Sequence, residues 1–293
     1  MSDLPAIGIT MFVTDRSMSP IELAREVEAR NFASLFLPEH SHIPVSRETV
    51  WPGSRPGEND PLPDYYSHML DQIVSLSMIG AVTTNLELGT AVTLIPQHDP
   101  IWLAKQFATL DHLTGGRVII GAGFGWNREQ GEDHGSPYLE RRDQTEDCIA
   151  IMRSLWRDEV AAHKGQHASV SPSWAWPKPA RSGGPPIVIG GMGPRTYRAI
   201  ARYADGWMPI SGRSSLADRL EPIKREFEAV GRDPSSLEVV VAGATTDPDG
   251  LINLGREGVQ RALLTVWSED RDETLRLLDQ YAEVKRRAEG LPG

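Results

Sequence analysis

Ala33-Ser-Leu-Phe-Leu-Pro-Glu39-His40-Ser41-His42 joins a short apolar run directly to a group of titratable side chains. An apolar run of this length, preceded by a helical pattern and bounded by polar residues, is typical of a buried strand in a parallel sheet. In α/β folds the chemistry lies at the C-terminal ends of such strands. The stretch therefore predicts a buried parallel strand with Glu39 and His40 at its functional end.

The same alternation of short β-branched runs and amphipathic stretches recurs about eight times along the chain. This pattern predicts an α/β fold, specifically a (β/α)8 TIM barrel. No shift in composition marks a second domain, so we expect one barrel domain over residues 1–293. The predicted strands span residues 6–12, 34–38, 87–94, 118–122, 186–190, 206–210, 238–242 and 261–266.

Helix boundaries and two insertions are also readable from the sequence. Ser19-Pro20-Ile21-Glu22 combines an N-cap, an early proline and a glutamate, and Asp99-Pro100 repeats the device. Gly115-Gly116 predicts the end of the second of these helices. Residues 43–65, after the second strand, and 160–185, before the fifth, are long proline-containing insertions. Such segments often cover a substrate site, so we expect lids there.

Composition limits the partners. The formal net charge of -10 over 293 residues argues against nucleic acid and against an anionic membrane surface, because both need clustered Lys and Arg. The chain has neither a signal-like start nor an apolar stretch of spanning length, so we expect a cytoplasmic protein that acts on a small molecule. Its one cysteine, Cys148, sits in an apolar helical pattern and predicts a core thiol.

Glu39-His40-Ser41-His42 has two interpretations of equal weight. A histidine at a barrel mouth is suited to proton transfer, and a neighbouring carboxylate can fix its tautomer, but paired loop histidines are equally consistent with the pattern. The spacing of His40 and His42 also suits a metal. Further ligands would then be needed at other strand ends, which read Gly121-Ala-Gly-Phe-Gly125 and Gly190-Gly-Met-Gly193, so we expect no metal.

Small residues mark two other sites. Leu88-Gly-Thr-Ala-Val-Thr93 interrupts a strand with small side chains, which suits either a bulge near a ligand or the taper of a barrel. After Gly190-Gly191-Met192-Gly193, a helix begins at Pro194, so free backbone N–H groups and the positive end of the helix dipole form an anion cradle. Arg195 adds positive charge there; Arg198 and Arg202 do so too, or form a solvated helix face.

The order of these elements resembles the luciferase-like monooxygenase superfamily, and within it the coenzyme F420 (deazaflavin)-dependent oxidoreductases. The similarity extends over nearly the whole chain and is weakest from about Asp247 onward. The motifs that carry it are Pro38-Glu-His-Ser-His-Ile-Pro44, Leu88-Gly-Thr-Ala-Val-Thr93, Asp99-Pro-Ile-Trp-Leu-Ala-Lys-Gln106, Thr109-Leu-Asp-His-Leu-Thr-Gly-Gly-Arg-Val118, Gly121-Ala-Gly-Phe-Gly-Trp-Asn127 and Gly190-Gly-Met-Gly193.

The resemblance implies a bacterial luciferase-like TIM barrel and a role for each motif. A non-prolyl cis peptide at Ala91-Val92 would support the deazaflavin ring from behind, and His40 would be catalytic. Sugar-phosphate dehydrogenases of the family have a glutamate acid where this chain has Trp126, so we do not expect that reaction. The residues that the resemblance places at the cofactor are Glu39, Ala91, Val92, Phe124, Gly125, Trp126, Gly191, Met192, Gly193, Arg195 and Thr196.

The expected activity is hydride transfer between C5 of F420 and a small organic substrate, with His40 moving the proton. The alternatives are an FMN-dependent luciferase-like monooxygenase that uses oxygen, a barrel metallohydrolase using His40 and His42, and a noncatalytic cofactor carrier. By resemblance to the family we expect a homodimer. The residues predicted to line the substrate pocket under the insertions are His42, Trp51, Tyr65, Trp174 and Trp176, with Tyr66 and Trp126 as further aromatic candidates.

Overall fold

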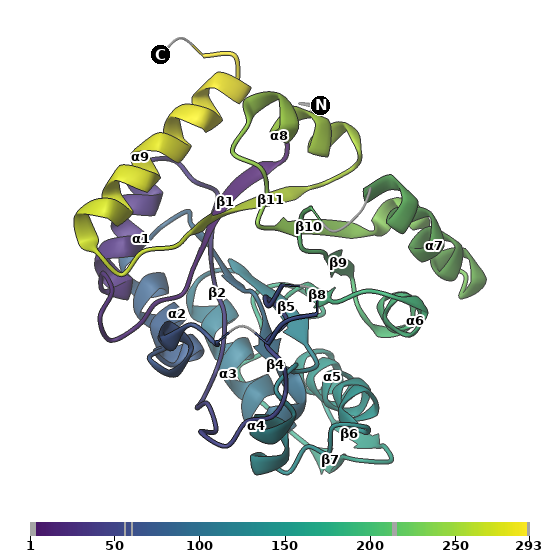
Figure 1. Cartoon of the computed structure of the whole chain (residues 1–293). Coiled ribbons are helices and arrows are strands. Elements are labelled where there is room, and N and C mark those ends of the chain that lie inside the picture. The colour runs from purple at the N-terminus through teal and green to yellow at the C-terminus, as the bar shows by residue number, and fades with distance from the viewer. Residues whose placement is uncertain (1–3, 56, 60, 213–215, 292–293) are drawn as a thin grey trace.

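Parallel strand pairing closes the chain on itself into a barrel (Figure 1). The computed structural model describes residues 4–55, 57–59, 61–212 and 216–291. Neighbouring strands follow the order β3-β2-β1-β11-β10-β9-β8-β5, and β3 pairs again with β5. The barrel strands are β1 Ala6–Met11, β2 Ser34–Leu37, β3 Glu87–Thr90 continued by β4 Thr93–Leu94, β5 Val118–Gly123, β8 Ile187–Gly190, β9 Gly206–Met208, β10 Glu238–Ala242 and β11 Arg261–Val266.

The predicted α/β barrel is thus confirmed, and each predicted strand overlaps an observed one. Two strands differ from expectation. The third is interrupted at Ala91-Val92, where the peptide bond is cis, as the resemblance implied. The sixth ends at Met208, and only an isolated bridge between Ile210 and Ala242 continues it.

Helices surround the barrel, and their ends follow the expected capping chemistry. The Ser19 hydroxyl accepts from the N–H of Glu22, and Asp99 accepts from Ile101 and Trp102. The helices are α1 Pro20–Ala29, α2 Gln72–Val82, α3 Pro100–Leu113, α4 Arg128–Asp133, α5 Arg141–Arg157, α6 Pro194–Tyr203, α7 Leu216–Ala229, α8 Pro248–Arg256 and α9 Arg271–Ala288, with short 3-10 turns η1 Asp64–Ser67, η2 Ile95–Gln97 and η3 Pro234–Ser236. No helix in the described ranges is long and apolar enough to cross a membrane.

The apolar core is divided between two layers. One large buried cluster lies between strands and helices and includes Cys148, the predicted core thiol. A second cluster fills the barrel interior and consists of Phe36, Ile119, Val188, Met208, Val240 and Leu263. Partly buried Ala91, Val92 and Ala242 pack on this second cluster.

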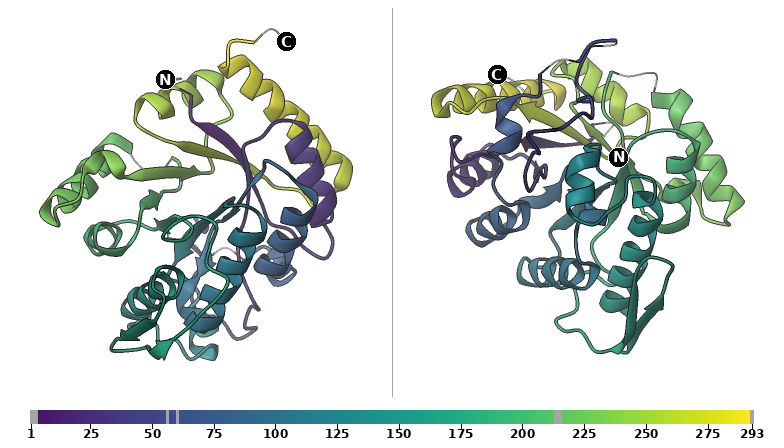
Figure 2. Two further views of the ribbon diagram at one scale, coloured as in Figure 1. Left: turned by 180° about the vertical axis from the view of Figure 1, so that it is seen from behind. Right: turned by 60° about the horizontal axis from the view of Figure 1, so that its bottom comes forward.

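The two insertions have different positions. Residues 160–185 form the hairpin of β6 Ala161–Lys164 and β7 Ser169–Ser173, which packs against α5 on the outside of the barrel (Figure 2). Residues 43–65, here called the lid segment, leave the C-terminal end of β2 and end in η1. Of the two insertions, only the one over residues 43–65 follows the strand end that carries His40.

Candidate active site at the mouth of the barrel

His40 lies at the C-terminal end of β2 in a largely enclosed environment. Its Nδ1 is 2.6 Å from Oε1 of Gln130 in α4, and its Nε2 accepts from the indole N–H of Trp126 at 3.3 Å. Gln130 Nε2 in turn donates to Oε1 of Gln97 at 3.1 Å. Because this donation fixes the Gln130 amide, its oxygen accepts a hydrogen bond from the Nδ1–H group of His40. The neutral imidazole therefore keeps a lone pair on Nε2.

Burial lowers the pKa of His40, and the hydrogen bond to Gln130 and the nearby Glu39 carboxylate only partly oppose it. The neutral form therefore predominates at neutral pH. A neutral imidazole with a fixed Nδ1 proton can accept a proton at Nε2 once a substrate hydroxyl replaces the Trp126 indole N–H as its hydrogen-bond partner, and the resulting cation can return the proton. This is the protonation state that an acid–base catalyst needs.

Glu39 supports the interrupted third strand. One carboxylate oxygen accepts from the N–H of Leu94 at 2.5 Å, and the other is 2.7 Å from Nε2 of His98. Burial lowers the pKa of His98, but the Glu39 carboxylate outweighs it and the net shift is upward. The pair thus ties the end of β2 to the segment that follows the Ala91-Val92 bulge. Contact between Glu39 and a cofactor, which the resemblance implied, stays a prediction.

Glycines next to the bulge allow the backbone to pack closely against it. A Cβ on Gly123 would lie 2.3 Å from Cγ2 of Val92, so only glycine lets that strand pass so close. Gly125 has φ +78° and lies beside Gln97, which a Cβ would approach to 3.1 Å. With Ala91, Val92 and Ala242, which pack on the inner cluster, these positions form a partly buried apolar floor at the bulge.

The N-terminus of α6 supplies an anion site next to this floor. Its N-cap is Gly193 with φ +95°, which has no side chain to accept from the first N–H groups of the helix. Arg142 of α5 donates to the Thr196 hydroxyl at 3.2 Å, and its guanidinium lies 4.1 Å from the centre of the Phe124 ring. Uncapped N–H groups beside a cation fit a phosphate.

The remaining predicted residues of the loop after β8 complete this site. Gly191 has φ +108°, and its carbonyl accepts from the indole N–H of Trp207 at 2.8 Å. Met192 is 43% exposed, and its carbonyl accepts from the Thr196 hydroxyl. Arg195 is mostly exposed and reaches Asp143 only at 4.0 Å. The structure thus brings together the residues assigned to the phosphate-bearing end of the cofactor.

His42 does not share a site with His40. Its Nε2 is 3.0 Å from Oδ2 of Asp133 and its Nδ1 is 3.0 Å from the Ser41 hydroxyl, both at the exposed rim. Ser41 is also 2.7 Å from Nε2 of His134. The spacing that suits a metal site does not give the two histidines a common partner, because the nitrogens of each ring contact different residues. Among the described residues, no three His, Cys, Asp or Glu side chains are grouped to hold a metal ion.

An aromatic pocket opens beside His40. Tyr66 packs 5.2 Å from the His40 ring, and Tyr65 lies 5.0 Å from Phe12 at the end of β1. Trp51 of the lid segment donates to the Tyr66 hydroxyl at 3.1 Å. Burial, aided by the neighbouring Tyr66, raises the pKa of Tyr65 to about 12. Burial also raises the pKa of Tyr66, so both phenols are neutral at physiological pH.

A small cavity of about 110 Å³ continues this aromatic surface between Phe12, Tyr65 and Trp267. The Phe12 and Trp267 rings stack at 5.3 Å. The structure does not bring Trp174 and Trp176 into the aromatic group. They are 77% and 60% exposed, follow the outer hairpin, and Lys105 of α3 donates to the Trp176 carbonyl. Of the predicted pocket residues, Trp51 and Tyr65 therefore contact Tyr66, which packs on His40, and His42 lies at the rim.

Glu129 of α4 anchors the lid segment. Its carboxylate accepts from the backbone N–H groups of Glu48 and Thr49, at 2.8 and 3.0 Å, and from the Thr49 hydroxyl at 2.6 Å. Burial would raise the pKa of Glu129, but these hydrogen bonds outweigh it and lower the pKa to about 2. The anchor therefore stays ionised over the whole physiological range.

We expect Glu129→Ala to loosen the lid segment with little effect on global stability. Losing three hydrogen bonds at a partly exposed site should lower the local opening free energy by about 1 kcal/mol. Hydrogen exchange of the Glu48 and Thr49 amides should then accelerate about fivefold. Glu132→Ala is the matched control, because Glu132 pairs only with Arg128 of the same helix. Equal exchange in both variants would show that Glu129 is not the anchor.

Comparison with known proteins assigns the fold and site to a family. The family model described as luciferase-like monooxygenase matches residues 17–246, most of the chain. The chain belongs to this family. As a luciferase-like protein it is 36% identical over 276 residues to an uncharacterised protein of Mycobacterium tuberculosis, covering 94% of this chain and 96% of the relative. The match ends close to Asp247, where the sequence similarity was expected to weaken.

Among luciferase-like relatives, one named for its activity is the F420-dependent hydroxymycolic acid dehydrogenase of Mycobacterium tuberculosis. It is 31% identical over 180 residues, which is 60% of this chain and 49% of that protein. Solved structures with the same fold include monooxygenase RslO1 from Streptomyces bottropensis (TM-score 0.76, 18% identity, 97% and 98% of the two chains). Another is the F420-dependent tetrahydromethanopterin reductase of Methanopyrus kandleri (TM-score 0.70, 14% identity, 95% and 98%). Proteins with this fold thus include both F420-dependent enzymes and monooxygenases.

Sequence reasoning missed several residues of the site. Gln130 and His98 hold His40 and Glu39, and Arg142 links Phe124 to Thr196. The sequence held a signal for Arg142. Arg141 and Arg142 lie in the first turn of α5, where their charge opposes the helix dipole and is stabilised by a nearby anion. No sequence signal pointed to Gln130, whose role depends on packing across 90 residues of chain.

Proposed function

We propose that this luciferase-like protein is an F420-dependent oxidoreductase that interconverts an alcohol and a carbonyl compound on a small, apolar organic substrate. The observation that carries the proposal is the neutral His40, whose Nε2 lone pair lies between Trp126 and the aromatic pocket. The bulge floor fits the cofactor ring, and the α6 N-terminus with Arg142 fits its phosphate.

When bound, the deazaflavin supplies a hydride acceptor or donor at C5. The protein residues do the rest. Tyr65, Tyr66 and Trp51 hold the apolar body of the substrate and exclude water from it. His40 accepts the hydroxyl proton at Nε2 as an alcohol is oxidised, and returns it to the carbonyl oxygen in the opposite direction. Gln130 holds the imidazole in the tautomer that both directions need.

The competing function is an FMN-dependent monooxygenase, because the monooxygenase RslO1 has the same fold. Titrating the purified protein with oxidised F420 and with FMN separates the two functions. We expect micromolar or tighter binding of F420 and binding of FMN at least tenfold weaker. Tight FMN binding with no F420 binding would refute the proposal. A screen of alcohols with oxidised F420, and of ketones with reduced F420, then identifies the substrate.

The pH dependence follows from the lowered pKa of His40. For alcohol oxidation, kcat/KM should be level near pH 7 to 8 and fall as the pH drops through the His40 pKa, because the protonated imidazole cannot accept a proton. The midpoint should lie below the usual value for histidine of about 6.5. Since the hydrogen bond to Gln130 raises that pKa, Gln130→Leu should move the midpoint lower still. A midpoint above 7 would contradict the assignment.

A further inference from the structure

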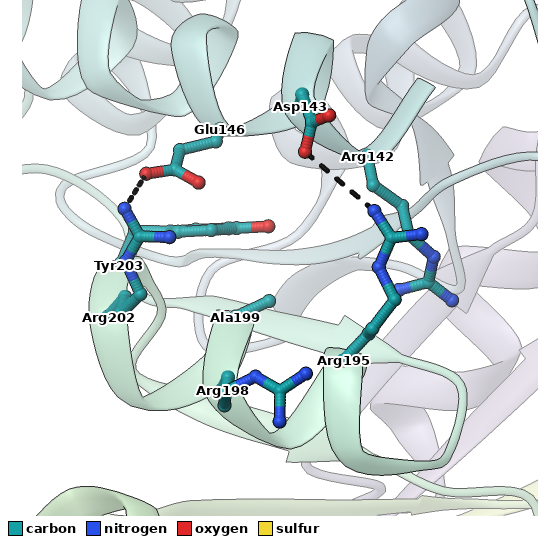
Figure 3. Close-up of a pocket in the computed structure, with 8 residues that line it drawn as sticks. All are labelled: Arg142, Asp143, Glu146, Arg195, Arg198, Ala199, Arg202 and Tyr203. Atoms are coloured by element: carbon teal, nitrogen blue, oxygen red, sulfur yellow. Dashed lines mark hydrogen bonds and ion pairs between the residues drawn. The ribbon is translucent and has the colours of Figure 1, made fainter. Parts of the chain in front are cut away.

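A groove lined by arginines leads away from the phosphate site (Figure 3). A cavity of about 210 Å³ begins at Arg142 and Arg195 and runs between α5 and α6. Its far end shares Arg202 and Tyr203 with a second cavity of about 520 Å³. The arginine groove is defined here by the residues Arg142, Arg195, Arg198, Arg202 and Tyr203.

The positive charge of this groove is incompletely neutralised, although the whole chain has a formal charge of -10. Arg202 pairs with Glu146 at 2.6 Å, but Arg195 approaches Asp143 only to 4.0 Å. Among the described residues, Arg198 has no ion-pair partner and Arg142 contacts no carboxylate. Burial and the like charges of Arg141 and Arg195 lower the pKa of Arg142, as expected where cations crowd without counterions.

The geometry suits an extended anion that is attached at the phosphate. Arg195, Arg198 and Arg202 recur at helical spacing along α6, so they line one face of that helix. A helix of 10 residues is about 15 Å long, several times the width of one phosphate. Coenzyme F420 carries a chain of γ-linked glutamates beyond its phosphate, whereas FMN ends at the phosphate.

We infer that the arginine groove binds the glutamate chain of coenzyme F420, with Arg198 and Arg202 holding carboxylates beyond the phosphate that binds at the N-terminus of α6 beside Arg142. This inference rests on the proposed function. On this inference, the positive charge outside the ring pocket determines which cofactor binds. FMN and F420 both have a flat ring and a phosphate, but only F420 has a chain that reaches the far end of the groove. The groove also makes affinity depend on tail length, which the ring pocket cannot sense.

Dissociation constants measured by quenching of deazaflavin fluorescence test the inference without turnover. The ligands are the tail-free phospholactyl deazaflavin and F420 with short and with long glutamate tails, each at low and high salt. In the native protein, affinity should rise with tail length, and salt should weaken binding of the tailed forms most. The double variant Arg198→Gln/Arg202→Gln should lose about tenfold in affinity for long-tailed F420 and keep its affinity for the tail-free form.

Arg25→Gln/Arg287→Gln is the matched control. It removes two exposed charges from α1 and α9, away from the groove, and should bind every ligand as the native protein does. Thermal melting checks that both double variants fold. Equal affinity for all tail lengths, or an equal loss for tailed and tail-free forms, would overturn the inference alone. Binding of FMN with no binding of any deazaflavin would overturn both the inference and the proposed function.

Discussion

Replacing His40 by alanine is expected to lower kcat by about 10²- to 10⁴-fold, the usual contribution of a positioned acid–base group. The Nε2 lone pair of the imidazole accepts from the Trp126 indole N–H, which the substrate hydroxyl must replace, and Gln130 holds the tautomer. Alanine removes the proton acceptor but leaves the bulge floor and the α6 N-terminus intact. Cofactor affinity should therefore change little, so the effect falls on turnover.

His42→Ala is the matched control for this experiment. It removes the same type of side chain two residues away, but His42 lies at the rim with Asp133 and its side chain is 41% exposed. Its kcat should stay close to that of the native protein. Steady-state kinetics with the substrate found in the screen, together with F420 titration of both variants, makes the comparison. Unchanged turnover of His40→Ala would remove the proton-transfer role and leave a cofactor carrier.

Gly121→Ala is expected to destabilise the barrel by about 3 kcal/mol or more. A Cβ at this position of β5 would lie 2.0 Å from the backbone oxygen of Thr90 and 2.8 Å from the methyl group of Met208. The Thr90 carbonyl cannot move aside freely, because β3 and β5 pair there to close the barrel and the Thr90 hydroxyl donates to the Gly121 carbonyl. The strain acts directly beneath the Ala91-Val92 bulge.

Urea unfolding measures this effect, and Gly190→Ala in the next strand is its control. A Cβ on Gly190 would meet Cγ1 of Val92 at an ordinary 3.4 Å, and the residue has no positive φ. That variant should stay within about 1 kcal/mol of the native protein. If Gly121→Ala and Gly190→Ala unfold at the same urea concentration, the prediction is wrong, and close packing where β3 pairs with β5 does not limit stability.

Much of the architecture was predictable because it depends on local patterns. Strand positions follow from apolar runs, and the starts of α1 and α3 follow from Ser19-Pro20 and Asp99-Pro100, whose capping bonds span at most three residues. The phosphate cradle at Gly193 was predictable for the same reason. The single domain, the homodimer and the cytoplasmic location stay predictions.

The errors came from side chains whose direction is set by distant segments. Trp174 and Trp176 were expected to line the pocket because their insertion is rich in aromatics and prolines, yet the hairpin of β6 and β7 packs outside α5. His42 was predicted to line the substrate pocket, and in the structure Asp133 and Ser41 hold it at the rim. A loop sequence carries no periodicity that fixes which neighbour it meets.

The sequence by itself determined the barrel, the glycine positions and the candidate base, because backbone preference and hydrophobic periodicity are local properties. The motifs also supplied the family and the place of the bulge. Only the tertiary structure decided which ring nitrogen of His40 carries the proton and where the arginines of the groove come together. Gln130, 90 residues away, fixes the tautomer, and α5 brings Arg142 to Thr196 across 54 residues. Protonation and local charge depend on distances in space, which closure of the barrel sets.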